Sequence, residues 1–269
     1  MRTVLTTPIG RIIDLLTVHV FAEGLLLVTS PGRANALFSH LRKNVFFNDK
    51  VKLEDASTSL SQRDLYGPKA PELLAALGLP GADLPLHAVV TASWHDQPLH
   101  VARIMPIAGA GFSLYAAAET LDSLEAALHQ AGAGDLDPGT WNVLRVEQGY
   151  GAYGSELSQE FIPLETGLWD AISFKKGCYV GQEIIARMES RGRLAKQLRG
   201  LRFSDPPAEI ALPTALTIAG KDAGLLTSLV ESPRHGLIGL AYVRTAHCTA
   251  DTAVSVADTS ARVVDLPFS

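Results

Sequence analysis

The last quarter of the sequence most strongly limits what this chain can fold into. After Gln197, six short apolar runs follow one another with turn residues between them: LRGLRF, ALTIAG, DAGLLTSLV, GLIGLAYVR, AVSVA and ARVVDLPF. None of them has a helical period. Short strands with regular turn signals are typical of closed β-structures, because closure removes the unpaired edge strands. We therefore predict a small antiparallel β-barrel over residues 197–269.

The first 196 residues alternate between strand-like and helix-like segments. Runs typical of strands cover residues 11–20, 24–30, 50–57, 86–94, 99–105 and 111–117. We expect a helix that is capped by Ser30 and has Pro31 at its first position. Further helical patterns cover residues 70–77, 119–131 and 138–148. This alternation predicts an α+β region over residues 1–196, placed before the barrel.

Composition narrows the class of protein. Of the 269 residues, 47% are hydrophobic and 19% are charged, which is ordinary for a globular chain. No apolar run reaches the ~18 residues that a membrane-spanning helix needs, and the N-terminus lacks the pattern of a signal peptide. Two cysteines, Cys178 and Cys248, make neither a disulfide framework nor a metal site. We expect a soluble protein of the reducing cytoplasm, with no membrane partner and no bound metal.

Charge is distributed unevenly along the chain. The net charge is −5, yet residues 175–202 contain eight basic side chains against two acidic ones. The basic members of this stretch are Lys175, Lys176, Arg187, Arg191, Arg193, Lys196, Arg199 and Arg202. Such a stretch attracts polyanions through its local field, so an RNA-contact module is one hypothesis. An ordinary solvated basic surface explains the same pattern equally well.

One segment combines this charge with a cysteine. In SFKKGCYVGQEIIARMESRGR, residues 173–193, the side chains of Val180, Ile184 and Met188 recur at helical spacing. Glu183 and Arg187 have the i, i+4 spacing of an ion pair. We therefore expect a helix from about residue 179, which would place Cys178 at its first turn or one residue before it.

A cysteine at a helix start has a chemical consequence. The positive end of the helix dipole, together with Lys175 and Lys176, would stabilise a thiolate at Cys178. Gly177 would permit a sharp turn, and Gly181 would permit close approach to the first turn. A thiolate can act as a nucleophile, a redox group or a soft-metal ligand. The alternative is that Cys178 is a small buried hydrophobic residue, as most free cysteines are.

The segment KKGCYVGQE resembles the signature of the YgfZ family of folate-binding proteins, which are relatives of the glycine-cleavage aminomethyltransferase. The resemblance extends upstream through LRVEQGYGAYGSELSQEFIPLETGL. It also includes LTTPIGRIIDLL near the N-terminus, and GLIGLAYVR and VVDLPF in the last part of the chain. Nearly the whole sequence is therefore covered.

The resemblance implies a tetrahydrofolate-binding α+β region of two subdomains, a C-terminal barrel and a folate-sized central hole. It implies a role in assembly or repair of iron–sulfur clusters, in support of client enzymes such as the tRNA methylthiolase. We expect a monomer with Cys178 as the functional residue, and a weak tRNA contact through the basic stretch. The expected folate-binding residues are Lys176, Gly177, Tyr179, Gly181, Gln182, Glu183, Arg187 and Glu165.

Three positions depart from the aminomethyltransferase pattern. The aspartate that serves aminomethyl transfer falls at Leu15, while Asp14 would point to the other face of its strand. A glutamate that binds the pterin falls at Ser113, and an arginine near the folate tail falls at Trp141. Aminomethyl transfer is therefore the alternative function and not the main one. By the usual size of such domains, the resemblance also leads us to expect about fifty residues before LTTPIGR.

Overall fold

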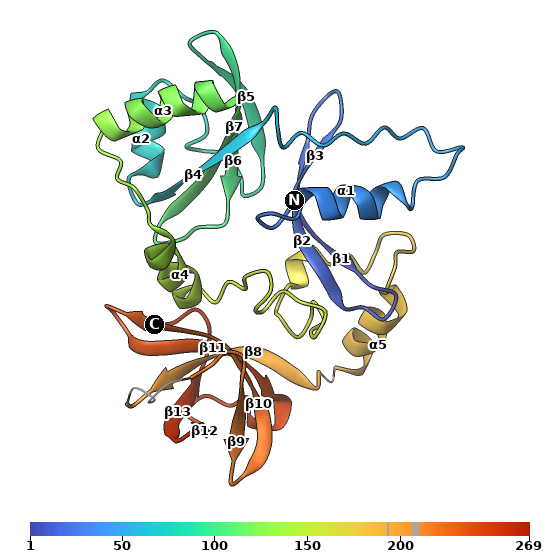
Figure 1. Ribbon diagram of the computed structural model, residues 1–269, viewed down its shortest axis with the longest axis vertical. Helices are drawn as coiled ribbons and strands as arrows, with labels where there is room; N and C mark the ends of the chain where they lie inside the picture. Colours follow the sequence, from blue (N-terminus) through green and yellow to red (C-terminus); the bar gives the residue numbers. More distant parts are fainter. Residues whose placement is uncertain (193, 206–209) are drawn as a thin grey trace. The chain divides into compact units, whose positions relative to one another are not determined.

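The computed structural model describes residues 1–192, 194–205 and 210–269 (Figure 1). Arg193 and the side chain of Arg191, two members of the basic stretch, lie outside the described part. The chain forms two compact units. Unit 1 contains Met1–Arg2 and Leu16–Asp135, and unit 2 contains Thr3–Leu15 and Leu136–Ser269.

Unit 1 contains a four-stranded antiparallel sheet in the order β4-β7-β6-β5. Its strands are β4 (Ser61–Gly67), β5 (Val89–Trp94), β6 (Gln97–Ile104) and β7 (Ala110–Ala116). Helices α2 (Ala70–Ala76) and α3 (Ala118–Gln130) pack on one face of this sheet (Figure 1). Their apolar stripes bury Leu74, Leu121 and Leu124 against Leu65 and Phe112. The predicted strands and helices of this part are confirmed, except that β4 was not expected.

A second sheet has the order β1-β2-β3. Its strands are β1 (Arg2–Thr6), β2 (Ile12–Val20) and β3 (Leu25–Val28), and helix α1 (Ala34–Arg42) follows. The expected cap at Ser30 is wrong, because the chain turns through Pro31 and Gly32 and the helix begins after Arg33. The strand expected at residues 50–57 is also wrong. That segment alternates in polarity but pairs with no strand, and alternation without a partner does not make a sheet.

Unit 2 contains the predicted β-barrel, closed in the order β10-β11-β8-β13-β12-β9. Its strands are β8 (Lys196–Phe203), β9 (Thr214–Ile218), β10 (Lys221–Ser232), β11 (Gly236–Arg244), β12 (Ala253–Val256) and β13 (Thr259–Val264). The interior holds a buried hydrophobic cluster that includes Leu201, Leu216, Leu226 and Val263. Close pairing of β10 with β11 requires Gly224, because a side chain there would collide with the carbonyl oxygen of Tyr242.

The rest of unit 2 contains α4 (Pro138–Glu147), α5 (Gln182–Arg191) and two short 3-10 helices, Trp169–Ala171 and Thr245–His247. Asp137 caps the start of α4, and its carboxylate accepts hydrogen bonds from the backbone N–H groups of Gly139 and Thr140. Val146 of this helix packs against the barrel residues Val230 and Ile238. The division at residues 196 and 197 stays a prediction, since unit 2 includes residues on both sides of it.

Candidate functional site

The segment that resembles the folate-binding signature lies in unit 2 as a loop followed by a helix. Helix α5 begins at Gln182, and its N-cap Gly181 has a left-handed backbone with φ of +86°. Cys178 therefore lies three residues before the N-cap, and the expectation that it occupies the helix start is wrong. A helix dipole acts mainly within the first and last turns, so its effect does not extend to position 178.

The beginning of α5 is fixed by the N-terminal part of unit 2. The Thr6 hydroxyl donates a hydrogen bond of 2.6 Å to the carbonyl oxygen of Val180. A Cβ on Gly181 would lie 2.7 Å from the carbonyl oxygen of Thr7 and 2.9 Å from the Thr6 hydroxyl. Gly10 lies against the side chain of Ile184. This contact between residues 6–10 and the start of α5, here called the clasp, requires glycine at position 181.

The clasp leaves the cysteine accessible. Cys178 is exposed, whereas Cys248 is buried. The Cys248 thiol lies 3.2 Å from the carbonyl oxygen of Val243. Burial raises the pKa of the Cys248 thiol, with desolvation as the main cause. The interpretation of Cys178 as a buried hydrophobic residue is therefore wrong. Its chemical role stays a prediction.

The neighbours of Cys178 in the loop make few contacts with one another. The Lys176 ammonium lies 4.8 Å from the centre of the Tyr179 ring, a cation–π contact. Within the described part of the chain, the buried Tyr179 hydroxyl has no hydrogen-bond partner, and desolvation raises its pKa. Gln182 accepts a hydrogen bond from the backbone of Tyr179. A Cβ at Gly177 would meet no atom within 4 Å, so this position does not require glycine for lack of space.

Helix α5 itself is partly as predicted. The Glu183–Arg187 ion pair forms at 2.8 Å, and Ile185 is fully buried. Val180, however, is 59% exposed and precedes the helix, so it is no member of the core stripe. Because Glu183 and Arg187 bind each other on an exposed surface, their role toward folate stays a prediction.

Glu165 lies apart from the Cys178 loop. It lines a cavity of about 510 Å³ with Trp169, Met188 and Arg199, and Cys178 is not among the lining residues. Its carboxylate accepts a hydrogen bond from the backbone N–H of Ile162. Desolvation raises the pKa of Glu165, and the nearby positive charge of Lys196 partly offsets this. Of the residues predicted to bind folate, Glu165 alone lines this cavity, and the others lie in the Cys178 loop and on α5.

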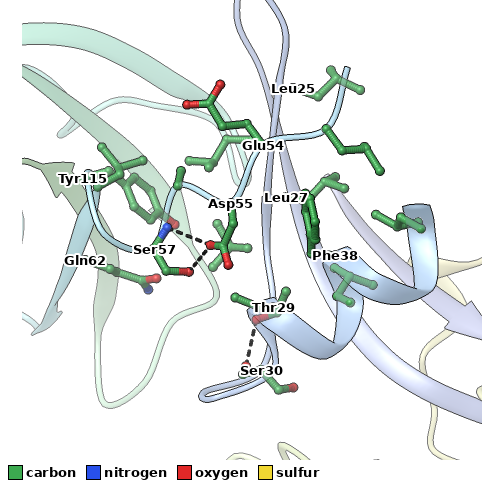
Figure 2. Close-up of a pocket in the computed structure, with 18 of the residues that line it drawn as sticks. Leu25, Leu27, Thr29, Ser30, Phe38, Glu54, Asp55, Ser57, Gln62 and Tyr115 are labelled. Atoms are coloured by element: carbon green, nitrogen blue, oxygen red, sulfur yellow. Dashed lines mark hydrogen bonds between the residues drawn. The ribbon is translucent and has the colours of Figure 1, made fainter. Parts of the chain in front are cut away.

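Unit 1 contains a second cavity, of about 460 Å³, that the sequence did not indicate. Figure 2 shows Leu27 and Phe38 on one side of it and Gln62 and Tyr115 on the other. The irregular segment of residues 52–57 lies between these sides. Asp55 shapes this segment by accepting hydrogen bonds from the backbone and hydroxyl of Ser57. The alternating polarity of residues 50–57 predicted a strand and gave no signal for such a cavity.

Two polar residues that line this cavity, Gln62 on β4 and Tyr115 on β7, form hydrogen bonds with neighbouring side chains of the sheets. Tyr115 contacts the imidazole Nε2 of buried His19 at 3.2 Å. Burial raises the pKa of Tyr115 to about 12 and lowers that of His19 to about 4. Both side chains are therefore neutral near pH 7, and they offer hydrogen bonds rather than charge.

A carboxylate lies beside Ser113, the position where the resemblance placed the pterin-binding glutamate. Asp64 is directly opposite Ser113 in the β4–β7 register and accepts a hydrogen bond of 2.6 Å from its hydroxyl. The Gln62 amide donates to the same carboxylate at 2.8 Å. The acid on this face of the sheet thus comes from the neighbouring strand.

The other two positions that depart from the aminomethyltransferase pattern, Leu15 and Trp141, lie in unit 2. Asp14 is 1% exposed, and Leu15 is half-buried and packs near Ile12 and Phe161. This alternation of burial confirms that the two side chains leave β2 on different faces. Trp141 on α4 is 37% exposed. The structure therefore offers an apolar side chain at position 15, where aminomethyl transfer would require an acid.

One group among the described residues has the composition of a metal site. Glu125, His129 and Asp135 bring their ligand atoms within 4.8 Å of one another at the end of α3. Arg63 already binds the Glu125 carboxylate at 2.8 Å, and the group is largely exposed. No described helix is both long and apolar enough to span a bilayer.

The mixed α/β architecture with its closed six-strand barrel is the fold of a glycine-cleavage aminomethyltransferase. The solved aminomethyltransferase T of Bartonella henselae superposes with a TM-score of 0.86, over 100% of this chain and 75% of that one, at 22% identity. The chain belongs to the family described as the GCVT N-terminal domain, whose model matches residues 2–176.

Two relatives show how far the similarity extends. A chloroplastic protein of Arabidopsis thaliana that is named as a transferase is 32% identical over 99% of this chain. The aminomethyltransferase of Moorella thermoacetica is 32% identical over 97% of it. The chain spans 62% of the length of the Arabidopsis relative and 74% of the Moorella one.

Proposed function

We propose that this protein binds tetrahydrofolate and acts as an accessory factor in iron–sulfur cluster assembly or repair, with Cys178 as its reactive group. The observation that carries the proposal is the exposed thiol in a signature loop whose end is fixed by the clasp. An ordered loop that presents an accessible thiol suits a chemical role better than a packing role. Membership of the GCVT N-terminal domain family supports the folate part.

The cavity of unit 1 fits part of a folate. A pteridine needs a flat apolar wall and hydrogen-bond partners at its edge. Phe38 and Leu27 would supply the apolar wall in this cavity. Gln62 and the protonated Tyr115 hydroxyl would supply the hydrogen bonds. Bound tetrahydrofolate would supply a carrier for one-carbon units, while these residues would bind it and exclude water.

Aminomethyl transfer is the second candidate, and the names of the relatives favour it. Leu15 argues against it. An alkyl side chain can neither hold nor move a proton, and the nearby carboxylate of Asp14 is buried on the other face of β2. We therefore place the accessory role first.

Calorimetric titration with tetrahydrofolate tests the folate part. We expect saturable binding to the wild-type protein and at least tenfold weaker binding to Phe38→Ala, because the variant loses apolar contact area. Lys43→Ala, which changes an exposed residue outside the cavity lining, is the matched control. Absence of saturable binding to the wild type would remove folate from the proposal.

An assay for methylenetetrahydrofolate formation from an aminomethylated carrier separates the two candidates. We expect no turnover, and turnover would establish the transferase instead. For the accessory role, Cys178→Ala should fail to restore the activity of an iron–sulfur enzyme in a deletion strain, whereas Cys248→Ala should restore it. Full rescue by Cys178→Ala would show that the thiol has no role.

A further inference from the structure

The Cys178 loop and the short 3-10 helix before it carry a group of exposed side chains in unit 2. Trp169, Phe174 and Val180 are 47%, 40% and 59% exposed. Lys175 and Lys176 directly follow Phe174 and are also exposed, and we call these five residues the aromatic–lysine patch. Large aromatic side chains gathered on a surface are typical of protein-binding sites, where they supply contact area at low entropic cost.

Local hydrogen bonds give the patch a defined conformation. The Ser173 hydroxyl accepts hydrogen bonds from the backbone N–H groups of both Lys175 and Lys176. The Trp169 and Phe174 rings lie with their centres 6.3 Å apart, within the range of a favourable aromatic pair. The clasp holds the carbonyl group of Val180 at the other end of the loop. A partner would therefore meet a surface that is already ordered, which lowers the entropic cost of binding.

The charge of the patch indicates the chemistry of the partner. Residues 169–182 contain two lysines and one acidic residue, Asp170, so this stretch carries a small positive charge in a chain whose net charge is −5. The Lys176 ammonium lies over the Tyr179 ring. The nearest acid that follows, Glu183, is bound to Arg187. The patch is thus a local positive area that includes apolar rings.

We propose that the aromatic–lysine patch is a docking surface for an acidic segment of a partner protein that carries an aromatic or aliphatic side chain. The carboxylates of such a segment would pair with Lys175 and Lys176, and its apolar side chain would pack on Trp169 and Phe174. Cys178, in the same loop, would then face the docked partner. This inference concerns protein recognition and does not depend on folate binding.

Disulfide exchange at Cys178 measures docking directly. Two synthetic peptides each carry a cysteine as its mixed disulfide with thionitrobenzoate, one built from glutamate and phenylalanine and the other from lysine and phenylalanine. The Cys178 thiolate attacks the peptide sulfur, so a new disulfide forms and coloured thionitrobenzoate leaves. We expect the acidic peptide to react about tenfold faster than the basic one, with loss of the difference at high salt.

Substitutions in the aromatic–lysine patch test whether the patch causes the faster reaction of the acidic peptide. Lys175→Glu/Lys176→Glu should reverse the preference, and Trp169→Ala should slow the acidic peptide without changing its salt dependence. Lys43→Glu/Lys50→Glu, the same charge change on exposed lysines of unit 1, should behave as wild type, and Cys178→Ser should not react. Equal rates for the two peptides, or equal effects of the two charge reversals, would overturn the proposal.

Tetrahydrofolate in the same assay separates this proposal from the folate proposal. We expect saturating tetrahydrofolate to leave the preference for the acidic peptide unchanged. If it abolishes the preference, Lys175 and Lys176 belong to the folate site and the docking proposal is wrong. If the titration shows no folate binding while the preference persists, docking stands and the folate part fails.

Discussion

Gly181 shows how one residue controls the candidate site. Its left-handed backbone and its contact with Thr6 and Thr7 leave no room for a Cβ. We predict that Gly181→Ala lowers the free energy of unfolding by about 1–3 kcal/mol and speeds alkylation of Cys178, because the clasp loosens. Gly177→Ala, where a Cβ meets nothing within 4 Å, is the control. Equal effects of the two changes in urea unfolding would contradict the role of the clasp.

His19 makes the stability of unit 1 depend on pH. Burial lowers its pKa to about 4, so between that pH and the ordinary value near 6.5 the unfolded chain binds more protons than the folded one. Stability is therefore complete above about pH 6.5 and falls as the pH drops toward 4, by up to about 3 kcal/mol. Urea unfolding between pH 4.5 and 7.5 measures the slope.

The variant His19→Phe should flatten this slope. His95→Asn is the control, because His95 is exposed and its positive φ of 48° suits asparagine. We expect the control to keep the wild-type slope. An unchanged slope in His19→Phe would assign the pH dependence to other groups.

At the scale of elements, a buried ion pair between Arg145 of α4 and Glu156 is hydrogen-bonded to the barrel strand β10 within unit 2. Glu156 is fully buried and accepts hydrogen bonds from Arg145 at 3.1 Å and from the hydroxyls of Thr227 and Ser228 at 2.6 Å. We predict that Glu156→Ala costs about 3–5 kcal/mol, because it leaves a buried guanidinium without its carboxylate. Chemical denaturation with a two-state fit measures the loss.

An exposed ion pair provides the comparison. Glu183→Ala removes the pair with Arg187 on the surface of α5, where both side chains are more than half exposed. We expect a cost of about 0.5 kcal/mol or less. Similar losses for Glu156→Ala and Glu183→Ala would show that burial of the Arg145 pair is not what stabilises this part of unit 2.

At the scale of the whole molecule, exposed apolar side chains bear on the expected monomeric state. Leu25 on β3 and Phe46, Phe47 and Val51 after α1 are all more than half exposed. Exposed apolar residues next to an edge strand favour association between chains. We predict concentration-dependent self-association in light scattering, and its reduction by Leu25→Lys. A wild-type protein that stays monomeric at all concentrations would contradict this.

Several features could be predicted from the sequence because their signals are local. The turn-bounded strands after Gln197 indicated the barrel, and the apolar stripe of Leu121, Leu124 and Leu128 indicated α3. The Glu183–Arg187 pair followed from helical spacing alone. In each case neighbouring residues carry the information, because strand and helix periods repeat within a few positions.

Other features depended on residues far apart in the sequence. The start of α5 is set by Thr6, which lies 174 positions from the carbonyl group that it binds, so the period of Val180 and Ile184 indicated a helix that began too early. The register of β4 with β7 placed Asp64 opposite Ser113. The sequence by itself determined most of the strands and helices, but not β4, the irregular segment of residues 50–57 or the start of α5. The tertiary structure decided which side chains meet, because steric fit and strand register are properties of the folded chain.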